Sequence, residues 1–228
     1  MTYSILAFDR KTGVLGAAAA TGSLCVGGWV LRGSLDSGLV ASQGTAPSSF
    51  WRDGVLRAMQ TGTAASDAVR DATEADAGRN HRQLTALDPS GTTAGFTGAS
   101  SVPFAAHACR SDLAVAGNML GSRDVLDALA EAFVATEGDM QDRLICALRA
   151  AADAGSDRRG LISAAMLVLS PDAAALDLRI DYAEEPLDAL SSLLTRTRDQ
   201  PYAGWLDVVP VEKDPTRAPI DQSPKAAE

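Results

Sequence analysis

The sequence has few of the side chains that usually build metal, redox or disulfide sites, with two histidines and three cysteines among 228 residues. His81 and His107 are too few for a histidine-rich metal site, although counting does not exclude carboxylate ligands for Mg²⁺ or Ca²⁺. Cys25, Cys109 and Cys146 lie far apart without a CxxC spacing, which fits neither a disulfide framework nor a zinc knuckle. We therefore expect no bound metal, no cofactor, and reduced thiols that are mostly buried.

The sequence has fewer basic than acidic residues, and this limits the classes of partner that the protein can bind. Lys and Arg number 20 against 29 Asp and Glu, which gives a net charge of −9. Such a surface repels the phosphates of nucleic acids and anionic lipids. With 5% aromatic residues it also offers few platforms for stacking bases. We expect a small-molecule substrate or ligand, and neither nucleic acid nor a membrane as partner.

Signals for export or membrane insertion are missing as well. The first ten residues have no basic start and only a short apolar run. The stretch 12–31 is uncharged, but it contains five glycines and few large apolar side chains. That composition is weak for a membrane span and typical of buried strand, turn and strand. These observations predict a cytoplasmic protein.

The sequence lacks the familiar catalytic signatures. It contains no GxGxxG, no Walker loop, no HExxH and no GxSxG. The sequence therefore gives no motif evidence for an enzyme with a phosphate-binding glycine loop, a zinc-binding helix or a nucleophile elbow.

What the sequence does contain is a regular succession of short strands and paired helices. Its length and its 46% hydrophobic residues support one compact domain, which we place at residues 1–199. Because the helices come in pairs between hairpins, the pattern favours an α+β fold with helices packed on antiparallel sheets. Strands are expected at 2–9, 14–21, 38–44, 83–88, 92–97, 104–110, 113–116, 163–170 and 176–182, and helices at 48–62, 63–75, 122–136, 140–152 and 186–198. Five prolines from Pro201 onward predict that residues 200–228 form an extended or partly disordered tail.

Thr2 follows Met1, and a small residue at this position is what Met-removing aminopeptidases accept. Removal of Met1 would give Thr2 a free α-amine with a pKa of about 8, close enough to neutrality to take the proton from its own hydroxyl. The strand expected at 2–9 would hold that nucleophile rigidly. The alternative is that the Met-Thr start has no catalytic meaning.

Four segments carry a resemblance to a known family. They are TYSILAFDRKTGVLGAAAA at 2–20, GRNHRQL at 78–84, GNML at 117–120 and GSDRRGLISAAMLV at 155–168. From residue 2 to about residue 198 the chain resembles the bacterial proteins grouped as domain of unknown function 1028. The resemblance implies the N-terminal-nucleophile (Ntn) hydrolase superfamily and its fold, a four-layer α-β-β-α sandwich.

The resemblance also implies a reaction, in which Thr2, exposed by removal of Met1, attacks an amide carbonyl. The oxyanion that develops needs hydrogen-bond donors, and losing one such donor costs about 10²–10³ in rate. Asn118 is our candidate, because its side-chain amide is a donor and Gly117 allows close backbone approach. The alternative is that Asn118 caps the turn before the next helix.

Two residues after the second strand have a binding role and a structural role as alternatives. Thr21 and Ser23 stand near the place where the family usually carries a bulkier Ser-Arg-Phe-Phe-like run. They either bond the substrate or the α-amine, or they are plain turn residues. Cys25, with no histidine or charge nearby in the sequence, is expected to be a buried thiol and not a nucleophile.

A compact charged loop precedes a strand that we expect to be buried. Asp157, Arg158 and Arg159 form it, and an arginine fork is suited to a carboxylate or phosphate of a substrate. The alternative is a solvated turn between helix and strand. Ser163 opens the next strand and is a further candidate for a substrate contact, whereas His107 is expected to be a hydrogen-bonded structural histidine.

Three hypotheses follow. The first is an Ntn-type amidohydrolase that cleaves a small-molecule C–N bond. The second is a catalytically silent protein of the same fold that binds a ligand or assembles with partners. The third is a self-associating subunit, a homo-oligomer, because Ntn sandwiches often form dimers or larger rings.

Overall fold

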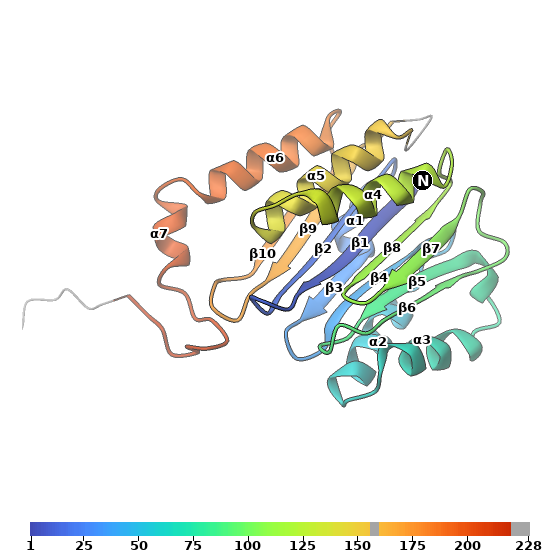
Figure 1. Ribbon diagram of the computed structural model, residues 1–228, viewed down its shortest axis with the longest axis horizontal. Helices are drawn as coiled ribbons and strands as arrows, with labels where there is room; N and C mark the ends of the chain where they lie inside the picture. The colour runs from blue at the N-terminus through green and yellow to red at the C-terminus, as the bar shows by residue number, and fades with distance from the viewer. Residues whose placement is uncertain (156–159, 220–228) are drawn as a thin grey trace, which may run out of the picture.

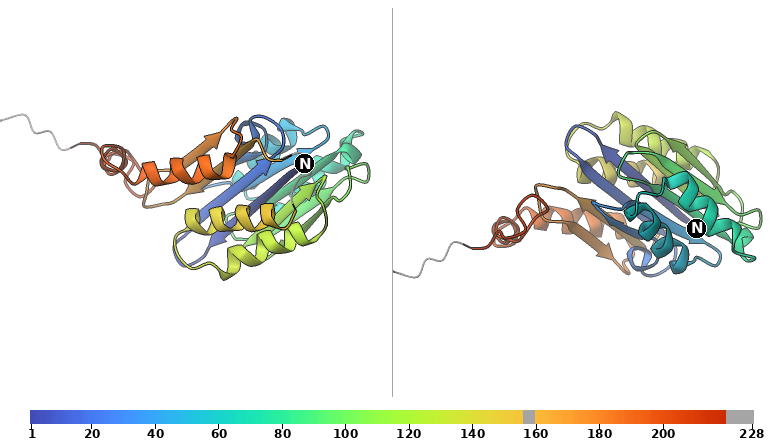
Figure 2. Two further views of the ribbon diagram at one scale, coloured as in Figure 1. Left: turned by 90° about the horizontal axis from the view of Figure 1, so that it is seen from above. Right: turned by 90° about the horizontal axis from the view of Figure 1, so that it is seen from below.

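Two antiparallel sheets lie face to face and carry helices on their outer sides (Figure 1). The structure is a computed structural model and describes residues 1–155 and 160–219. The larger sheet has six strands in the order β10-β9-β2-β1-β8-β7, and the smaller has four in the order β3-β4-β5-β6. Helices α4, α5 and α6 cover the outer face of the larger sheet, and α2 and α3 cover the smaller one (Figure 2). The expected α+β architecture with antiparallel sheets is confirmed.

The element boundaries follow the sequence pattern closely. The strands are β1 Thr2–Asp9, β2 Val14–Thr21, β3 Leu31–Ser34, β4 Gly38–Gly44, β5 Arg82–Leu87, β6 Thr93–Thr97, β7 Ala106–Arg110, β8 Leu113–Asn118, β9 Ser163–Leu169 and β10 Leu176–Ile180. The helices are α1 Val26–Trp29, α2 Ser49–Gln60, α3 Ala65–Glu74, α4 Asp124–Ala135, α5 Met140–Asp153, α6 Pro186–Thr197 and α7 Tyr202–Leu206, with a 3₁₀ turn at Arg79–His81.

Alternation of side chains along the central strand decides which residues meet the helices. Tyr3 and Ile5 on β1 belong to the hydrophobic cluster beneath α4, α5 and α6. Leu6 belongs to a second cluster, which fills the space between the two sheets. Because successive side chains of a strand point to opposite faces, Thr2 lies on the same face as Leu6, toward the smaller sheet.

Small residues let the two sheets approach each other. Ala17 and Ala19 on β2 face the smaller sheet, and Ala18 and Ala20 face the helices. All four are fully buried. The alanine run therefore forms a strand despite its weak β-propensity, because close packing on both faces stabilises it.

Three expectations from the sequence are corrected. Residues 26–29 form the short helix α1 and 31–34 the strand β3, where the stretch 12–31 was expected to be a buried strand, a turn and a strand. The tail is not wholly extended, since Tyr202–Leu206 is helical and Arg217 donates hydrogen bonds to the carbonyls of Leu206 and Val209. The thiols are not mostly buried, because Cys109 and Cys146 are exposed and Cys25 is partly buried.

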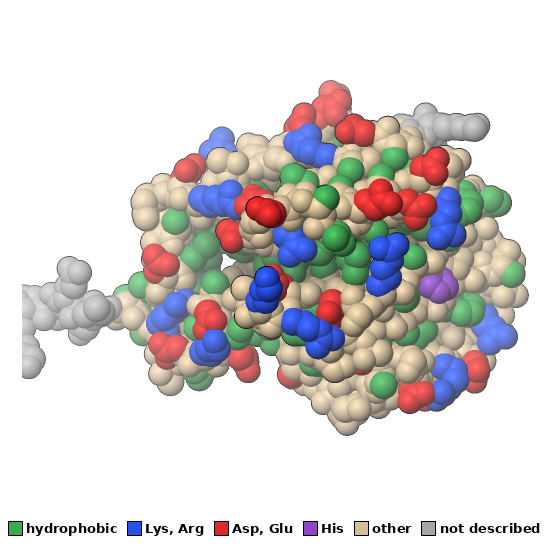
Figure 3. Space-filling model, viewed as in Figure 1, with side chains coloured by type: hydrophobic (Ala, Val, Ile, Leu, Met, Phe, Trp, Pro, Cys, Tyr) green, Lys and Arg blue, Asp and Glu red, His purple; other side chains and the backbone are tan. Residues whose placement is uncertain are grey.

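The outer surface mixes charges of both signs. On the face shown in Figure 3, acidic and basic side chains are interspersed over the helices. Several form exposed ion pairs, for example Arg198 with Asp142 and Arg149 with Asp188. Within the described residues, no helix has both the length and the apolar character needed to cross a membrane.

Candidate functional site

A row of polar side chains crosses the larger sheet at the end where β1 begins. Thr2 pairs with Thr21 on one side and with Asn118 on the other, and Thr21 pairs in turn with Ser163. All four lie on the face toward the smaller sheet, because side chains alternate along a strand and residues two or four positions away on the same strands face that sheet. Four residues that the sequence singled out, from four different strands, are therefore adjacent.

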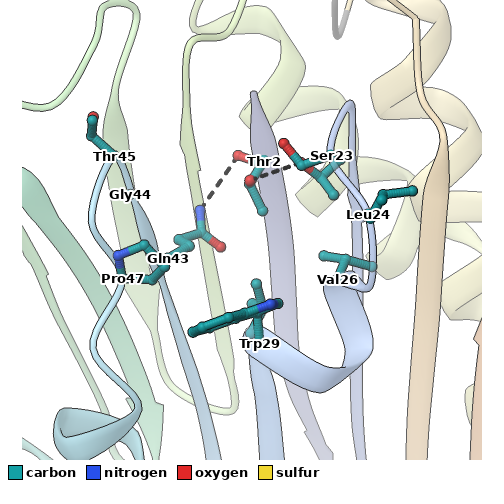
Figure 4. Close-up of a pocket in the computed structure, with 11 residues that line it drawn as sticks. Thr2, Ser23, Leu24, Val26, Trp29, Gln43, Gly44, Thr45 and Pro47 are labelled. Carbon is teal, nitrogen blue, oxygen red and sulfur yellow. Dashed lines mark hydrogen bonds between the residues drawn. The ribbon is translucent and has the colours of Figure 1, made fainter. Parts of the chain in front are cut away.

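A pocket of about 390 Å³ opens at this row (Figure 4). One wall comes from the start of β1 and the end of β2, and another from the segment that contains α1. The third wall is the end of β4 with the loop that follows it. The lining residues are Thr2, Thr21, Ser23, Leu24, Val26, Trp29, Val30, Gln43, Gly44, Thr45 and Pro47.

The hydroxyls of Thr2 and Thr21 are hydrogen-bonded to each other, with 3.0 Å between the two Oγ1 atoms. The Thr21 hydroxyl donates its hydrogen to the carbonyl oxygen of Met1. Because a hydroxyl has a single hydrogen, Thr2 must be the donor in the bond between the two threonines. Met1 itself is 3% exposed, and its amino group lies 3.4 Å from Sδ of Met119.

Two glutamines of the smaller sheet face the row. Nε2 of Gln43 on β4 donates to Oε1 of Gln83 on β5 over 2.7 Å and lies 3.4 Å from the carbonyl oxygen of Thr2. Nε2 of Gln83 is within hydrogen-bond distance of the carbonyl oxygens of Ala106 (2.9 Å) and Gly117 (3.0 Å). The glutamines therefore connect the two sheets beneath the pocket.

Asn118 belongs to the same network. Its Nδ2 donates to Oε1 of Gln83 over 3.3 Å, and its side chain is almost fully buried. The residue ends β8 directly beside Thr2. The structure therefore places its amide donor in the polar row, held by a glutamine of the other sheet.

Ser163 supports the pocket from behind. Its hydroxyl donates to the carbonyl of Ser23 over 2.7 Å and accepts from the backbone N–H of Val26 over 3.2 Å. The side chain is fully buried and does not line the pocket. Its observed contacts fix the turn that carries Ser23 and Leu24, whereas a direct substrate contact stays a prediction.

The remaining candidates fall in different places. Ser23 is exposed and lines the pocket, and its role in binding stays a prediction. Cys25 does not line the pocket and precedes α1 with a positive φ of 61°. Asp157, Arg158 and Arg159 lie outside the described residues.

His107 lies at the far end of the glutamine network. Its Nδ1 is 2.8 Å from Oγ1 of Thr97, which accepts a hydrogen bond from Nε2 of Gln83. The imidazole packs against the backbone of Gly95, and this desolvation lowers the pKa of His107 below its ordinary value. The expected hydrogen-bonded histidine is confirmed.

Charge is absent from the lining of the pocket. None of its eleven lining residues carries an ionisable side chain. Within residues 1–155 and 160–219, no three His, Cys, Asp or Glu side chains are grouped closely enough to hold a metal ion. The described chemistry of the site is therefore that of hydroxyls, carboxamides and apolar side chains.

The glutamines are the functional residues that the sequence analysis missed. Both occupy positions of strands whose neighbours two residues away, such as Ala41 for Gln43 and Thr85 for Gln83, face the other sheet and are buried. A glutamine at an inward position of a buried strand is the signal that could have found them, because a buried amide needs partners.

The model of a family of unknown function, DUF1028, matches residues 2–190. The chain is also similar to protein SPO2555 from Silicibacter pomeroyi, a DUF1028 protein with a crystal structure. The two are 48% identical with a TM-score of 0.91, over 95% of this chain and 98% of that one. A comparison with functionally curated proteins found no match.

Proposed function

This chain belongs to the family of unknown function DUF1028, and we propose that it is an amidohydrolase of the N-terminal-nucleophile type. It would cleave a C–N bond of a small molecule with Thr2 after removal of Met1. The observation that carries the proposal is the position of Thr2. Its hydroxyl lies in the wall of the largely uncharged pocket, at the first residue of a central strand, one peptide bond from the start of the chain.

The surroundings of Thr2 support a role as nucleophile. Removal of Met1 takes away the carbonyl oxygen that now accepts a hydrogen bond from the Thr21 hydroxyl. Thr21 would then be free to bond the new α-amine of Thr2 while still accepting from the Thr2 hydroxyl. Both the base and the nucleophile would be oriented by one residue of the neighbouring strand.

The proposed reaction proceeds in two halves. Oγ1 of Thr2 attacks the amide carbon while the α-amine takes its proton, and Asn118 with backbone N–H groups stabilises the oxyanion. The proton passes to the nitrogen of the substrate, the C–N bond breaks, and the amine leaves an ester on Thr2. Water then hydrolyses that ester, which regenerates the hydroxyl and releases the acid.

The arrangement of layers is a second support. Helices α4–α6, the two sheets, and helices α2 and α3 follow one another in the order that the Ntn sandwich requires (Figure 2). Thr2, the proposed nucleophile, begins β1, which lies inside the larger sheet. We therefore assign the fold to the Ntn type as part of the proposal.

Intact mass and substitution test the proposal together. Protein from its own cells should be lighter than the full chain by one methionine, about 131 Da. A screen of amides should find turnover that Thr2→Ala abolishes and Thr2→Ser retains in part, with melting temperatures within a few degrees. Thr195→Ala, at an exposed threonine of α6 outside the pocket lining, is the matched control and should keep activity. Turnover that survives in Thr2→Ala would refute the mechanism.

The burial of Met1 favours a second candidate function, a silent ligand-binding protein of the same fold. Met1 is 3% exposed and its carbonyl is held by Thr21. Such a protein would keep Met1 in its own cells and bind a ligand without turnover. A full-length mass from those cells, combined with tight binding, would support it over the hydrolase.

A further inference from the structure

We infer that the pocket beside Thr2 takes an uncharged amide whose N–H group donates to Oε1 of Gln43 and whose apolar group lies against Trp29. The inference deepens the proposed function by naming the class of substrate, and only the statement that this amide is also cleaved rests on that function.

The orientation of Gln43 follows from a chain of donors and acceptors. Gln83 has its Nε2 against two backbone carbonyls, those of Ala106 and Gly117, so its Oε1 must be the atom that faces Gln43. An oxygen there requires a donor, and Nε2 of Gln43 supplies it. The carbonyl oxygen of Thr2 is a second acceptor for the same Nε2.

Oε1 of Gln43 is therefore left without a donor. It is buried and has no hydrogen-bond partner among the described residues, although the residue lines the pocket. Figure 4 shows this oxygen turned into the space between Thr2 and Trp29. A buried acceptor without a partner is destabilising, and a ligand N–H placed there would supply the missing hydrogen bond.

The lining excludes charged ligands in this position. A carboxylate would direct its own lone pairs at Oε1 of Gln43, and no cationic side chain lies among the lining residues. An ammonium group could donate to Oε1, but it would be desolvated without a carboxylate partner in the lining. An uncharged amide N–H satisfies the acceptor at no such cost.

The opposite side of the pocket provides an apolar surface. Trp29 is 55% exposed and Leu24 57% exposed, and both line the pocket together with the buried Val26. An exposed indole beside a polar group is a common feature of ligand sites, because it gains apolar burial when a ligand covers it. The ligand should therefore carry an aromatic or aliphatic group next to its amide.

A matched series of small ligands tests the inference by binding alone. The series is 3-phenylpropanamide, its N,N-dimethyl derivative, 3-phenylpropanoate and 3-phenylpropylamine, titrated by calorimetry into the chain that retains Met1. With Met1 in place residue 2 has no free α-amine, so the pocket lining stays uncharged, the proposed base is blocked, and the backbone carbonyl that holds Gln43 is kept. We expect the primary amide to bind at least tenfold more tightly than each of the other three.

A variant assigns the preference to Gln43. Gln43→Met removes the acceptor with little change of volume and should abolish the preference for the primary amide over its dimethyl derivative. Gln60→Met on the surface of α2 is the matched control and should retain it. If Gln43→Met fails to fold, the ligand series still decides the question, because it needs no change at this position.

The outcomes separate the two proposals. Preference for the carboxylate, equal binding of the dimethyl amide, or no binding of any ligand at millimolar concentration would each overturn the inference. If the primary amide is preferred but the protein with free Thr2 does not cleave it, the ligand class stands and the hydrolysis of this amide is refuted.

Discussion

Gln43 and Gln83 lie opposite each other on neighbouring strands of the smaller sheet and share a 2.7 Å side-chain hydrogen bond at its inner face. Through Gln43 the pair reaches the carbonyl of Thr2 on β1, and through Gln83 it reaches β7 and β8 of the larger sheet. This pair therefore connects the polar row of the larger sheet to the end of β4 that lines the pocket.

Gln83→Met should destabilise the protein strongly. Gln43 and Asn118 would each lose the acceptor of a buried amide hydrogen. Buried polar groups left without partners cost about 1–3 kcal/mol each, so we expect a loss of about 3 kcal/mol. For a chain of this size that corresponds to a fall of roughly 6–12 °C in Tm, measurable by calorimetry. Gln60→Met should change Tm by less than a third of that, and equal effects would contradict the role given to Gln83.

Thr21→Val should lower activity without unfolding the protein. The substitution keeps the shape of the side chain but removes the hydroxyl that accepts from Thr2. A misplaced nucleophile costs about 10²-fold, so kcat/KM for an amide substrate should fall roughly 10²-fold. Retention of full activity would show that Thr21 does not orient Thr2.

Thr85→Val is the matched control, on the inner face of the smaller sheet. Thr85 is fully buried, and its hydroxyl finds no partner within the described residues. Because an unpartnered buried hydroxyl is destabilising, this variant should leave activity unchanged and raise the free energy of unfolding by about 1 kcal/mol.

Substitution by alanine should change the free energy of unfolding in opposite directions at two glycines, one within α2 and one just beyond its end. Gly54 lies within the helix and Gly62 follows it, and an added Cβ would meet no atom within 4 Å at either position. Gly54→Ala should raise the free energy of unfolding by about 0.5–1 kcal/mol, because alanine loses less backbone entropy. Gly62 has a φ of +90°, which strains a residue with a Cβ, so Gly62→Ala should lower the free energy of unfolding by about 1–2 kcal/mol. Denaturant melts of both variants decide whether backbone conformation, and not space, sets the difference.

Stability should decrease as the pH falls below the ordinary pKa of histidine, partly through His107. Its pKa is lowered in the folded protein, because desolvation favours the neutral imidazole. Between about pH 6.5 and that lower value the unfolded chain binds the proton first, so acid favours unfolding in this window. Part of the surface of His107 remains in contact with solvent, so we expect a small effect.

His107→Gln separates this contribution from that of the carboxylates. The difference in Tm between pH 7 and pH 5.5 should be smaller in the variant than in the unchanged protein. An NMR titration of His107 should also give a midpoint below 6.5. A midpoint above that value would contradict the packing of the ring on Gly95.

The sequence predicted the elements with strong local signals. Strand β1 and strand β2 were predicted with the boundaries observed, because a Gly-containing turn separates two buried runs. Helix α2 was predicted from Ser48, whose hydroxyl does accept from the backbone N–H of Trp51. Helix α1 was missed, since its four residues VGGW have no helical periodicity, and it is held by tertiary bonds such as that of Val26 to Ser163.

The site was predicted only in the parts that lie on one sheet. Thr2, Thr21, Ser163 and Asn118 share the larger sheet, and their register follows once the strands are paired. Gln43 comes from the other sheet, and no local pattern says which residue of β4 will face Thr2. That contact depends on how two sheets stack, which is set by packing over many residues and not by a motif.

The position of β1 in the middle of the larger sheet has a consequence for how the protein is made. Asn118, the partner of Thr2, is synthesised 116 residues later, so at about 5–20 residues per second β1 waits roughly 6–23 s for this partner. During this interval an aminopeptidase can reach Met1. Once β8 docks, Met1 is 3% exposed and its amine contacts Met119. If Met1 is removed as proposed, its removal would therefore have to precede the docking of β8, and a chain that folded first would keep Met1.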